Sequence, residues 1–180
     1  MSNGVLIWLD LEMTGLDVEK DVIVEVAALA TSFDLEPLDE GIDIVVHQPP
    51  EVLAGMGDFV REMHTKSKLL DAIVASTVDL AEAGDRVLAY IKTHAPSPAT
   101  VPLCGNSIGV DRRFLSRQLP AIESHLHYRS IDVSSLKELC RRWYPDQFKA
   151  RPTKNEGHRA LADVRASIAE LKYYRETILR

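Results

Sequence analysis

The sequence predicts an α/β fold in which helices flank a mixed five-stranded sheet. Three extended segments joined by short turns open the chain, and from about residue 100 onward strands alternate with helical segments. The 180 residues, 46% of them hydrophobic, are enough for one domain with a sizeable core. We therefore expect a single domain over residues 1–180.

The first three strands are predicted at 4–12, 21–33 and 41–47. All three are rich in aliphatic residues, and turn-forming residues around Gly15 and Gly41 separate them. Because the connections are short, the three strands should form an antiparallel meander.

Helices are predicted next, near 66–75 and 78–94. The second has an N-cap candidate in Asp79, and it should end before the proline-rich loop at 95–102. The short apolar segment 101–105 that follows has the character of a buried fourth strand.

An amphipathic helix closed by Pro120 follows, and a fifth strand is predicted at 128–133. A Ser-Leu-Lys-Glu capping box at 135–138 should open a short helix. The segment 144–157 is the longest predicted loop, and the last helix is expected at about 159–178, where apolar residues recur at helical spacing.

The charge balance restricts the partners. The formal net charge is −6, whereas proteins that bind long nucleic acids usually carry a basic surface, so a long duplex is not expected as a partner. Basic residues do gather between 129 and 154. Such a local patch fits either a small phosphorylated ligand or a solvated helix face.

Two cysteines, Cys104 and Cys140, lie in apolar surroundings and are predicted to be reduced core thiols. No apolar stretch has the length of a membrane span, and the N-terminus lacks the pattern of a targeting segment. We therefore expect no membrane association and a cytoplasmic location.

Two carboxylates, Asp10 and Glu12, end the first predicted strand. Residues two apart on a strand project from the same face, and burying two negative charges side by side is costly. A divalent cation such as Mg²⁺ or Mn²⁺, which prefers oxygen ligands, would neutralise them. Solvated acidic pairs are also common at strand ends, so the pair alone leaves both interpretations open.

Two further motifs supply polar residues. Asn106 and Ser107 precede Asp111 where the fourth strand leads into a helix, and the Asn-Ser pair would either cap that helix or bind substrate. His158 and Asp163 are five positions apart, a rotation of about 140° on a helix, so His158 belongs to the loop or the first turn. A proton-transfer histidine beside a metal-binding carboxylate fits this spacing, and a solvated surface histidine is the alternative.

Together the three motifs resemble those of the DEDDh family of 3′→5′ exonucleases, which have a ribonuclease H-like fold. The motifs occur in the order Asp10-x-Glu12, Asn106-Ser107-x-x-x-Asp111 and His158-x-x-x-x-Asp163. The segments 10–16, 63–67 and 128–134 narrow the resemblance to members that act on short oligoribonucleotides. It extends over essentially the whole chain.

The resemblance implies catalysis with two divalent cations, Mg²⁺ or Mn²⁺. It implies that Asp10 bridges the ions, that Glu12 and Asp163 hold the ion that activates water, and that Asp111 orders the second ion. His158 would take the proton from the attacking water. The products would be nucleoside 5′-monophosphates.

The resemblance also implies a substrate of about two to five nucleotides, including dinucleotides such as linear pGpG, bound through stacking and end recognition. Leu16 would form a wedge between bases, Phe59 would offer a stacking face where the family commonly has Trp, and His64 aligns with a substrate-contacting histidine. Core packing is the alternative for Leu16 and Phe59.

Recognition of the 5′ end is expected from Arg129, Ser134 and Lys137, which would cap a terminal phosphate and exclude longer RNA. The resemblance further implies a homodimer in which Tyr128 reaches the active site of the partner. A Tyr128 that is buried within its own subunit is the alternative.

Two other functions remain open. An exonuclease of the same motif class that proofreads DNA or trims structured RNA would need an open groove or basic tracks, which the acidic balance disfavours. A non-enzymatic adaptor with this fold would not need all four acids and the histidine.

Overall fold

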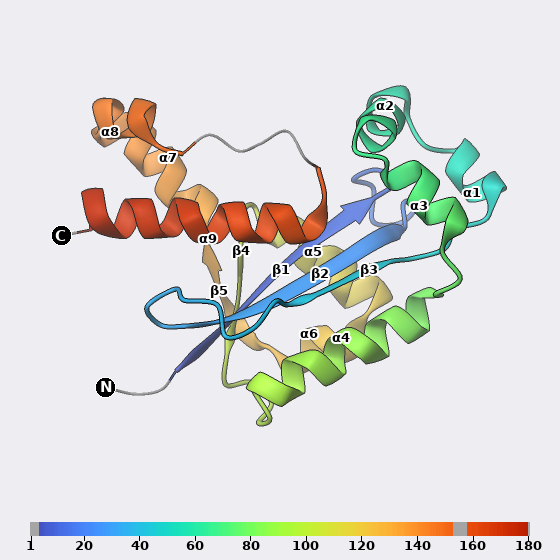
Figure 1. Ribbon diagram of the computed structural model, residues 1–180, viewed down its shortest axis with the longest axis horizontal. Coiled ribbons are helices and arrows are strands. Elements are labelled where there is room, and N and C mark those ends of the chain that lie inside the picture. The colour runs from blue at the N-terminus through green and yellow to red at the C-terminus, as the bar shows by residue number, and fades with distance from the viewer. Residues whose placement is uncertain (1–3, 153–157, 180) are drawn as a thin grey trace.

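The computed structural model describes residues 4–152 and 158–179. Its centre is a five-stranded sheet with the strand order β3-β2-β1-β4-β5, covered by helices (Figure 1). The strands are β1 (Val5–Met13), β2 (Ile23–Ser32), β3 (Ile42–Val45), β4 (Pro102–Gly105) and β5 (His127–Asp132). The helices are α1 (Pro50–Ala54), α2 (Asp58–Lys66), α3 (Leu69–Ala75), α4 (Leu80–His94), α5 (Gly109–Gln118), α6 (Pro120–His125), α7 (Val133–Trp143), α8 (Pro145–Ala150) and α9 (Ala160–Thr177).

The sheet is mixed, as the sequence predicts. β1 pairs antiparallel with β2, and β2 pairs antiparallel with β3, so the opening meander is confirmed. β4 pairs parallel with β1, and β5 pairs parallel with β4. β1 therefore lies in the middle of the sheet, where its carboxyl end is surrounded by other elements.

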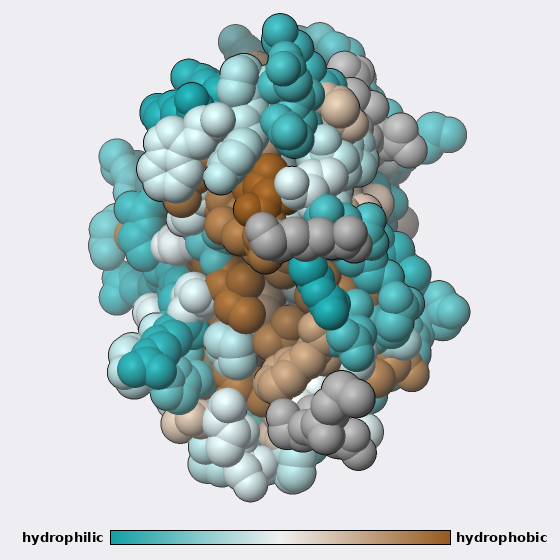
Figure 2. Space-filling model, turned by 90° about the vertical axis from the view of Figure 1, so that its left-hand side faces the viewer, coloured by the Kyte–Doolittle hydropathy of each residue, from teal (hydrophilic) through white to brown (hydrophobic). Residues whose placement is uncertain are grey.

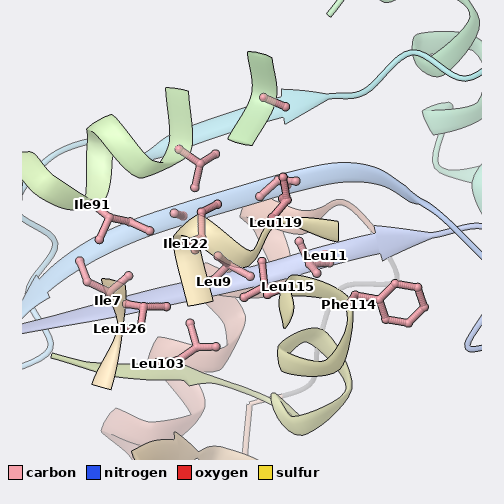
Figure 3. Packing of buried hydrophobic residues seen from close by; sticks show 14 of the residues in the cluster. Ile7, Leu9, Leu11, Ile91, Leu103, Phe114, Leu115, Leu119, Ile122 and Leu126 are labelled. Atoms are coloured by element: carbon pink, nitrogen blue, oxygen red, sulfur yellow. The ribbon is translucent and has the colours of Figure 1, made fainter. Parts of the chain in front are cut away.

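Side chains of β1 alternate between two apolar layers. Ile7, Leu9 and Leu11 point toward the side chains of α4, α5 and α6 (Figure 3). Leu6 and Trp8 belong to the other layer, which packs beneath α9 and α7. By the same alternation Asp10 and Glu12 continue the row of Leu6 and Trp8 toward the N-terminal end of α9. The strand thus changes from apolar to acidic on the face that α9 covers.

A smaller apolar cluster holds the helices between β3 and α4. Leu53, Met56, Leu69 and Ile73 from the α1–α3 region pack against Val24 of β2. This cluster anchors α2 beside the carboxyl end of β1, so residues of α2 lie near the two acids.

Four short helices were not predicted from the sequence: α1, α2, α6 and α8. Three of them begin with a proline at the first helical position, where proline is favoured. Pro120 was predicted only to end the preceding helix, and Pro145 was predicted to lie in a loop. The prediction of a loop over 144–157 is accordingly wrong for α8, and residues 153–157 of that segment lie outside the described residues.

The predicted helix boundaries are confirmed at one cap and corrected at another. Asp79 caps α4, and its side chain accepts a hydrogen bond from the Glu82 amide. The cap of α7 is Asp132 rather than Ser135, because the chain enters that helix directly from β5. Cys104 and Cys140 are buried and free, as predicted. Among the described residues, none of the helices has the length and apolar character needed to cross a membrane.

Candidate active site

Three acids from two elements meet at the carboxyl end of β1. Asp10 and Glu12 lie on the strand, and Asp163 lies in the first turn of α9. One carboxylate oxygen from each residue lies within 4.8 Å of those of the other two. Glu12 is only 8% exposed. Three carboxylate oxygens so close together, partly shielded from water, form a donor set that fits a divalent cation.

Asp111 reaches the same strand from α5, a hundred positions later in the chain. It is buried in the first turn of α5, and its Oδ1 accepts a hydrogen bond of 3.0 Å from the Leu11 amide. The parallel pairing of β1 with β4 ends at Trp8 and Cys104, so the Leu11 amide lies beyond that ladder. Asp111 satisfies this amide and is thereby fixed beside the acids of β1.

The four acids and His158 line one open hollow of ≈ 390 Å³. His158 is exposed and stands two residues before α9, as the spacing of the third motif predicts. Leu16, just after the first motif, and Asn106 and Ser107 of the second motif also line the hollow. The structure therefore brings together eight of the residues that the sequence predicts for the site.

Leu16, Phe59 and Tyr128 are exposed by 68%, 80% and 75%, respectively. Core packing is therefore excluded for Leu16 and Phe59, and burial within its own subunit is excluded for Tyr128. Phe59 lies on α2 beside a second depression, which His158 also lines. Exposed apolar side chains such as Leu16 and Phe59, which line these two depressions, are suited to contact with the flat faces of bases.

His64 is buried behind the acids rather than in the hollow. Its Nε2 lies 2.9 Å from the Met13 carbonyl oxygen, and its Nδ1 lies 4.0 Å from Oε2 of Glu12. Burial lowers the pKa of His64, so the neutral ring is favoured. The structure thus gives His64 a contact with Glu12, and its contact with substrate stays a prediction.

The second motif does not cap α5. The N-cap position of α5 is Ile108, without a side-chain cap, and Ser107 has a left-handed backbone with φ of 52°. The Ser134 hydroxyl instead accepts a bond of 2.7 Å from the Ser107 amide and donates to Oδ1 of Asn106 at 3.2 Å. The capping interpretation is therefore wrong, and the motif joins Ser134 to the hollow.

Lys137 turns toward the same network. Its Nζ lies 3.4 Å from Oδ1 of Asn106 and 3.0 Å from Oε2 of Glu170, a buried acid of α9. Nδ2 of Asn106 also donates to Glu170, at 3.2 Å. Asn106, Ser134 and Lys137 are thus connected by hydrogen bonds at one edge of the hollow.

Arg129 is exposed on β5, where its guanidinium lies 5.4 Å from the centre of the Tyr128 ring. Arg112 of α5 holds this part of β5 through bonds to the carbonyl oxygens of His127, Tyr128 and Arg129. The exposed side chains of Tyr128 and Arg129 therefore project from a backbone that is well fixed.

Comparison with known proteins identifies the family. The profile of an exonuclease family, RNase_T, matches residues 7–171. An oligoribonuclease of Mycobacterium avium is 55% identical over 172 residues, which are 96% of this chain and 80% of that protein. The chain belongs to the oligoribonuclease family of exonucleases. An oligoribonuclease of Streptomyces avermitilis is 53% identical over 176 residues, 98% of this chain and 88% of that protein.

Membership of the oligoribonuclease family confirms the predictions of a DEDDh-type exonuclease and of an enzyme. It removes the non-enzymatic adaptor from consideration. Together with the cluster of three carboxylates, it indicates dependence on a divalent metal.

Solved structures confirm the ribonuclease H-like fold. The zinc-bound complex of E. coli exonuclease I with single-stranded DNA has a TM-score of 0.69 and 18% identity, over 99% of this chain and 42% of that chain. Exonuclease I from Methylocaldum szegediense has a TM-score of 0.63 and 21% identity, over 98% of this chain and 41% of that chain. This chain thus spans about two fifths of these exonucleases, and at such identities the likeness concerns the fold.

Several residues that organise this family member's site were not predicted. Glu170 holds Asn106 and Lys137, and Glu25 of β2 pairs with Arg159 just before α9. Each of these pairs joins residues far apart in the chain, so no local spacing marks them. Asp132 was detectable in principle, because an aspartate between a strand and a helix is a common N-cap.

Proposed function

We propose that this family member removes nucleotides from the 3′ end of short RNA and hydrolyses 5′-phosphorylated dinucleotides, including linear pGpG, to nucleoside 5′-monophosphates. The observation that carries the proposal is the meeting of four acids and His158, from three distant motifs, in one small open hollow. The names of the relatives and the net charge of −6 also support a short substrate, for which phosphate tracking contributes little.

For the metal, we propose two divalent cations, Mg²⁺ or Mn²⁺. Asp10, Glu12 and Asp163 would hold one, and Asp10 and Asp111 the other. The spacing of the first three carboxylates and the burial of Glu12 support this assignment. When bound, such cations would favour ionisation of water and stabilise the charge that develops on the attacking and leaving oxygens.

We propose that His158 is the general base. It is exposed at the rim of the hollow, within the same lining as Asp10 and Asp163, and a neutral imidazole accepts a proton readily near neutral pH. His158 would accept the proton of the attacking water. A loop position allows the ring to approach the water without displacing the helix that carries Asp163.

Substrate contacts are proposed for the residues around the hollow. Leu16 would separate neighbouring bases and Phe59 would stack on one of them, as their exposure supports. At the other edge, Asn106 and Ser107 would contact the substrate, and Arg129, Ser134 and Lys137 would bind a terminal 5′-phosphate.

A homodimer is proposed, in which Tyr128 extends into the partner's hollow. Large apolar side chains are exposed along α7 and at its end: Leu139, Trp143 and Tyr144. Figure 2 shows apolar residues gathered in the middle of the face that carries α7, α8 and the C-terminal end of α9. An exposed patch of this kind is typical of interaction sites.

The deciding experiment compares Mn²⁺-dependent hydrolysis of a 5′-phosphorylated diribonucleotide and of a twenty-nucleotide RNA by the wild type and Asp163→Ala. We expect fast, metal-dependent cleavage of the dinucleotide, much slower cleavage of the long RNA, and loss of both in the variant. Equal or faster cleavage of the long strand would instead favour a processive or proofreading exonuclease.

A further inference from the structure

Glu25 is a buried acid that the proposed mechanism does not use. It lies in β2 directly opposite Glu12 of β1, and its exposure is 0%. Opposite residues of an antiparallel pair share one face of the sheet, so Glu25 stands on the face that carries Asp10 and Glu12. A buried carboxylate beside other acids is costly unless a cation or N–H groups compensate its charge.

Arg159 and the start of α9 provide this compensation. Nε of Arg159 donates to Oε1 of Glu25 at 2.7 Å, and a terminal guanidinium nitrogen lies 2.6 Å from the same oxygen. Oε2 of Glu25 accepts a bond of 2.9 Å from the Ala160 amide. Arg159 is the N-cap residue of α9 but makes no side-chain cap of its own. Glu25 therefore neutralises Arg159 and caps the helix from the neighbouring strand.

His158 directly precedes this pair and has a strained backbone. Its φ of 39° lies in the left-handed region, which a residue with a side chain occupies only where its surroundings fix it. The bonds from Glu25 to Arg159 and Ala160 fix the chain immediately after His158. Asp163 needs no such support, because its amide donates to the Arg159 carbonyl at 3.0 Å as part of the helix.

The ion pairs of three other cations of α9, Arg165, Lys172 and Arg175, have a different character. Their acidic partners are largely exposed, with side-chain exposures of 96% for Glu40, 69% for Glu36 and 76% for Asp34. Exposed pairs contribute little to stability and do not hold a backbone in one conformation. The Glu25–Arg159 pair differs because its acid is fully buried and also binds a backbone amide.

We propose that the Glu25–Arg159 pair positions His158 for proton transfer, so that Glu25 and Arg159 act on the reaction without contacting the substrate. The inference rests on the role of His158 proposed above. It assigns a catalytic consequence to two residues outside the three motifs. An error of about 1 Å in the position of a proton-transfer group is enough to reduce a rate by about a hundredfold.

The test measures kcat and KM for the 5′-phosphorylated diribonucleotide at saturating Mn²⁺. Glu25→Gln keeps the size and one acceptor oxygen but removes the charge that holds Arg159. We expect kcat to fall by about tenfold or more while KM changes by less than about threefold. Arg159→Lys should lose less activity than Arg159→Met, since it retains the charge. Glu40→Gln, at the exposed partner of Arg165 on the same helix, is the matched control and should keep the wild-type kcat.

A double variant separates positioning of His158 from general support of the fold. If the pair acts through His158, Glu25→Gln should lower kcat by less than about threefold in a His158→Ala background. Circular dichroism and the melting temperature of each variant show whether it is folded at the assay temperature. If Glu25→Gln does not fold, the two Arg159 variants decide by the same criteria.

The outcomes distinguish this inference from the proposed function. An active wild type, an impaired His158→Ala and a Glu25→Gln variant with wild-type kcat would overturn the inference alone. An equal loss from Glu25→Gln with and without His158 would also overturn it, because the pair would then act elsewhere. A His158→Ala variant with wild-type kcat would refute the base assignment, and the inference would fail with it.

Discussion

Asp43 on β3 illustrates how a single residue beside the site affects stability. Burial, and then the neighbouring Glu25 carboxylate, raise the pKa of Asp43 from 3.8 to about 6. The folded state therefore holds this proton more tightly than the unfolded state does. The stabilisation that protonated Asp43 gives the folded state is complete below about pH 4 and is lost as the pH rises through 6.

Asp43→Asn should consequently stabilise the protein at pH 7.5. We expect the free energy of unfolding to rise by about 1 kcal/mol at pH 7.5 and to change little at pH 4. The figure of about 1 kcal/mol allows for solvent screening, because the Asp43 side chain is 28% exposed. Urea denaturation at the two pH values measures both numbers. Asp34→Asn, at an exposed acid, is the control and should have little effect at either pH. The same gain at pH 4 and pH 7.5 would contradict the assignment.

Arg129 and Ser134 should determine the preference for a 5′-phosphate. Replacing either with Ala removes a donor to the phosphate, and charge-assisted hydrogen bonds contribute about 1.5–3 kcal/mol. We expect Arg129→Ala to reduce the ratio of kcat/KM for phosphorylated over unphosphorylated dinucleotide by about tenfold or more, and Ser134→Ala to reduce it less. Arg141→Ala, at an exposed position of α7, should leave the ratio unchanged. An unaltered ratio in Arg129→Ala would contradict the proposed binding site for the 5′-phosphate.

At the scale of elements, the caps of α4 and α7 offer a matched comparison. Oδ1 of Asp79 accepts from Glu82, whereas Oδ1 of Asp132 accepts from the amides of both Ser134 and Ser107, each at 2.9 Å. Replacing either aspartate with Ala should cost about 1 kcal/mol of stability. Only Asp132→Ala should also raise KM for the phosphorylated dinucleotide by several-fold, because Ser107 and Ser134, both proposed to contact the substrate, lose the hydrogen bonds that fix their backbone. Equal KM values for the two variants would contradict this link.

The long elements were predictable from the sequence because burial imposes a period on them. β1 and β2 are buried apolar runs, and α4 and α9 repeat apolar residues at helical spacing. The short helices α1, α6 and α8 were not predicted, since each has few residues and starts at a proline. A proline that ends one helix is equally suited to begin the next.

The acids of the site were predictable because the three motifs together resemble those of the DEDDh exonucleases, whereas Asp10 and Glu12 alone left a solvated acidic pair as the alternative. Asp10 and Glu12 interrupt an apolar row two residues apart, and Asp163 follows His158 at the start of an amphipathic helix. The residues that hold them were not predictable, because Glu25 meets Arg159 across 134 positions and Asn106 meets Glu170 across 64. Only the folded topology brings such partners together.

At the scale of the whole molecule, the basic residues gathered between 129 and 154 contrast with the net charge of −6. The basic residues of 129–154 do not form one uniform surface among the described residues. Arg142 pairs with Glu138 on the surface, whereas Lys137 and Arg151 both turn toward the buried Glu170. Because carboxylates already pair with these cations, they do not form a continuous basic track for a long strand.

A shared active site makes a strong prediction about mixed dimers. Tyr128 is 75% exposed and points away from its own core, so in the proposed homodimer it would complete the partner's hollow. Tyr128→Ala and Asp163→Ala should each be severely impaired as homodimers. In a mixed dimer, however, the subunit with intact acids receives Tyr128 from the Asp163→Ala subunit, so one of the two sites is complete.

Random assembly of the two variants gives mixed molecules in about half of the dimers, each with one working site. Coexpressed variants should therefore recover about one quarter of the wild-type kcat for the dinucleotide, and mixed dimers isolated through two different tags should recover about half. Asp163→Ala coexpressed with Asp10→Ala is the matched control, because both changes fall within one subunit's acids. That mixture leaves no subunit with a full set and should stay inactive. A monomer by light scattering, or a mixture no more active than its two parents, would show that each chain works alone.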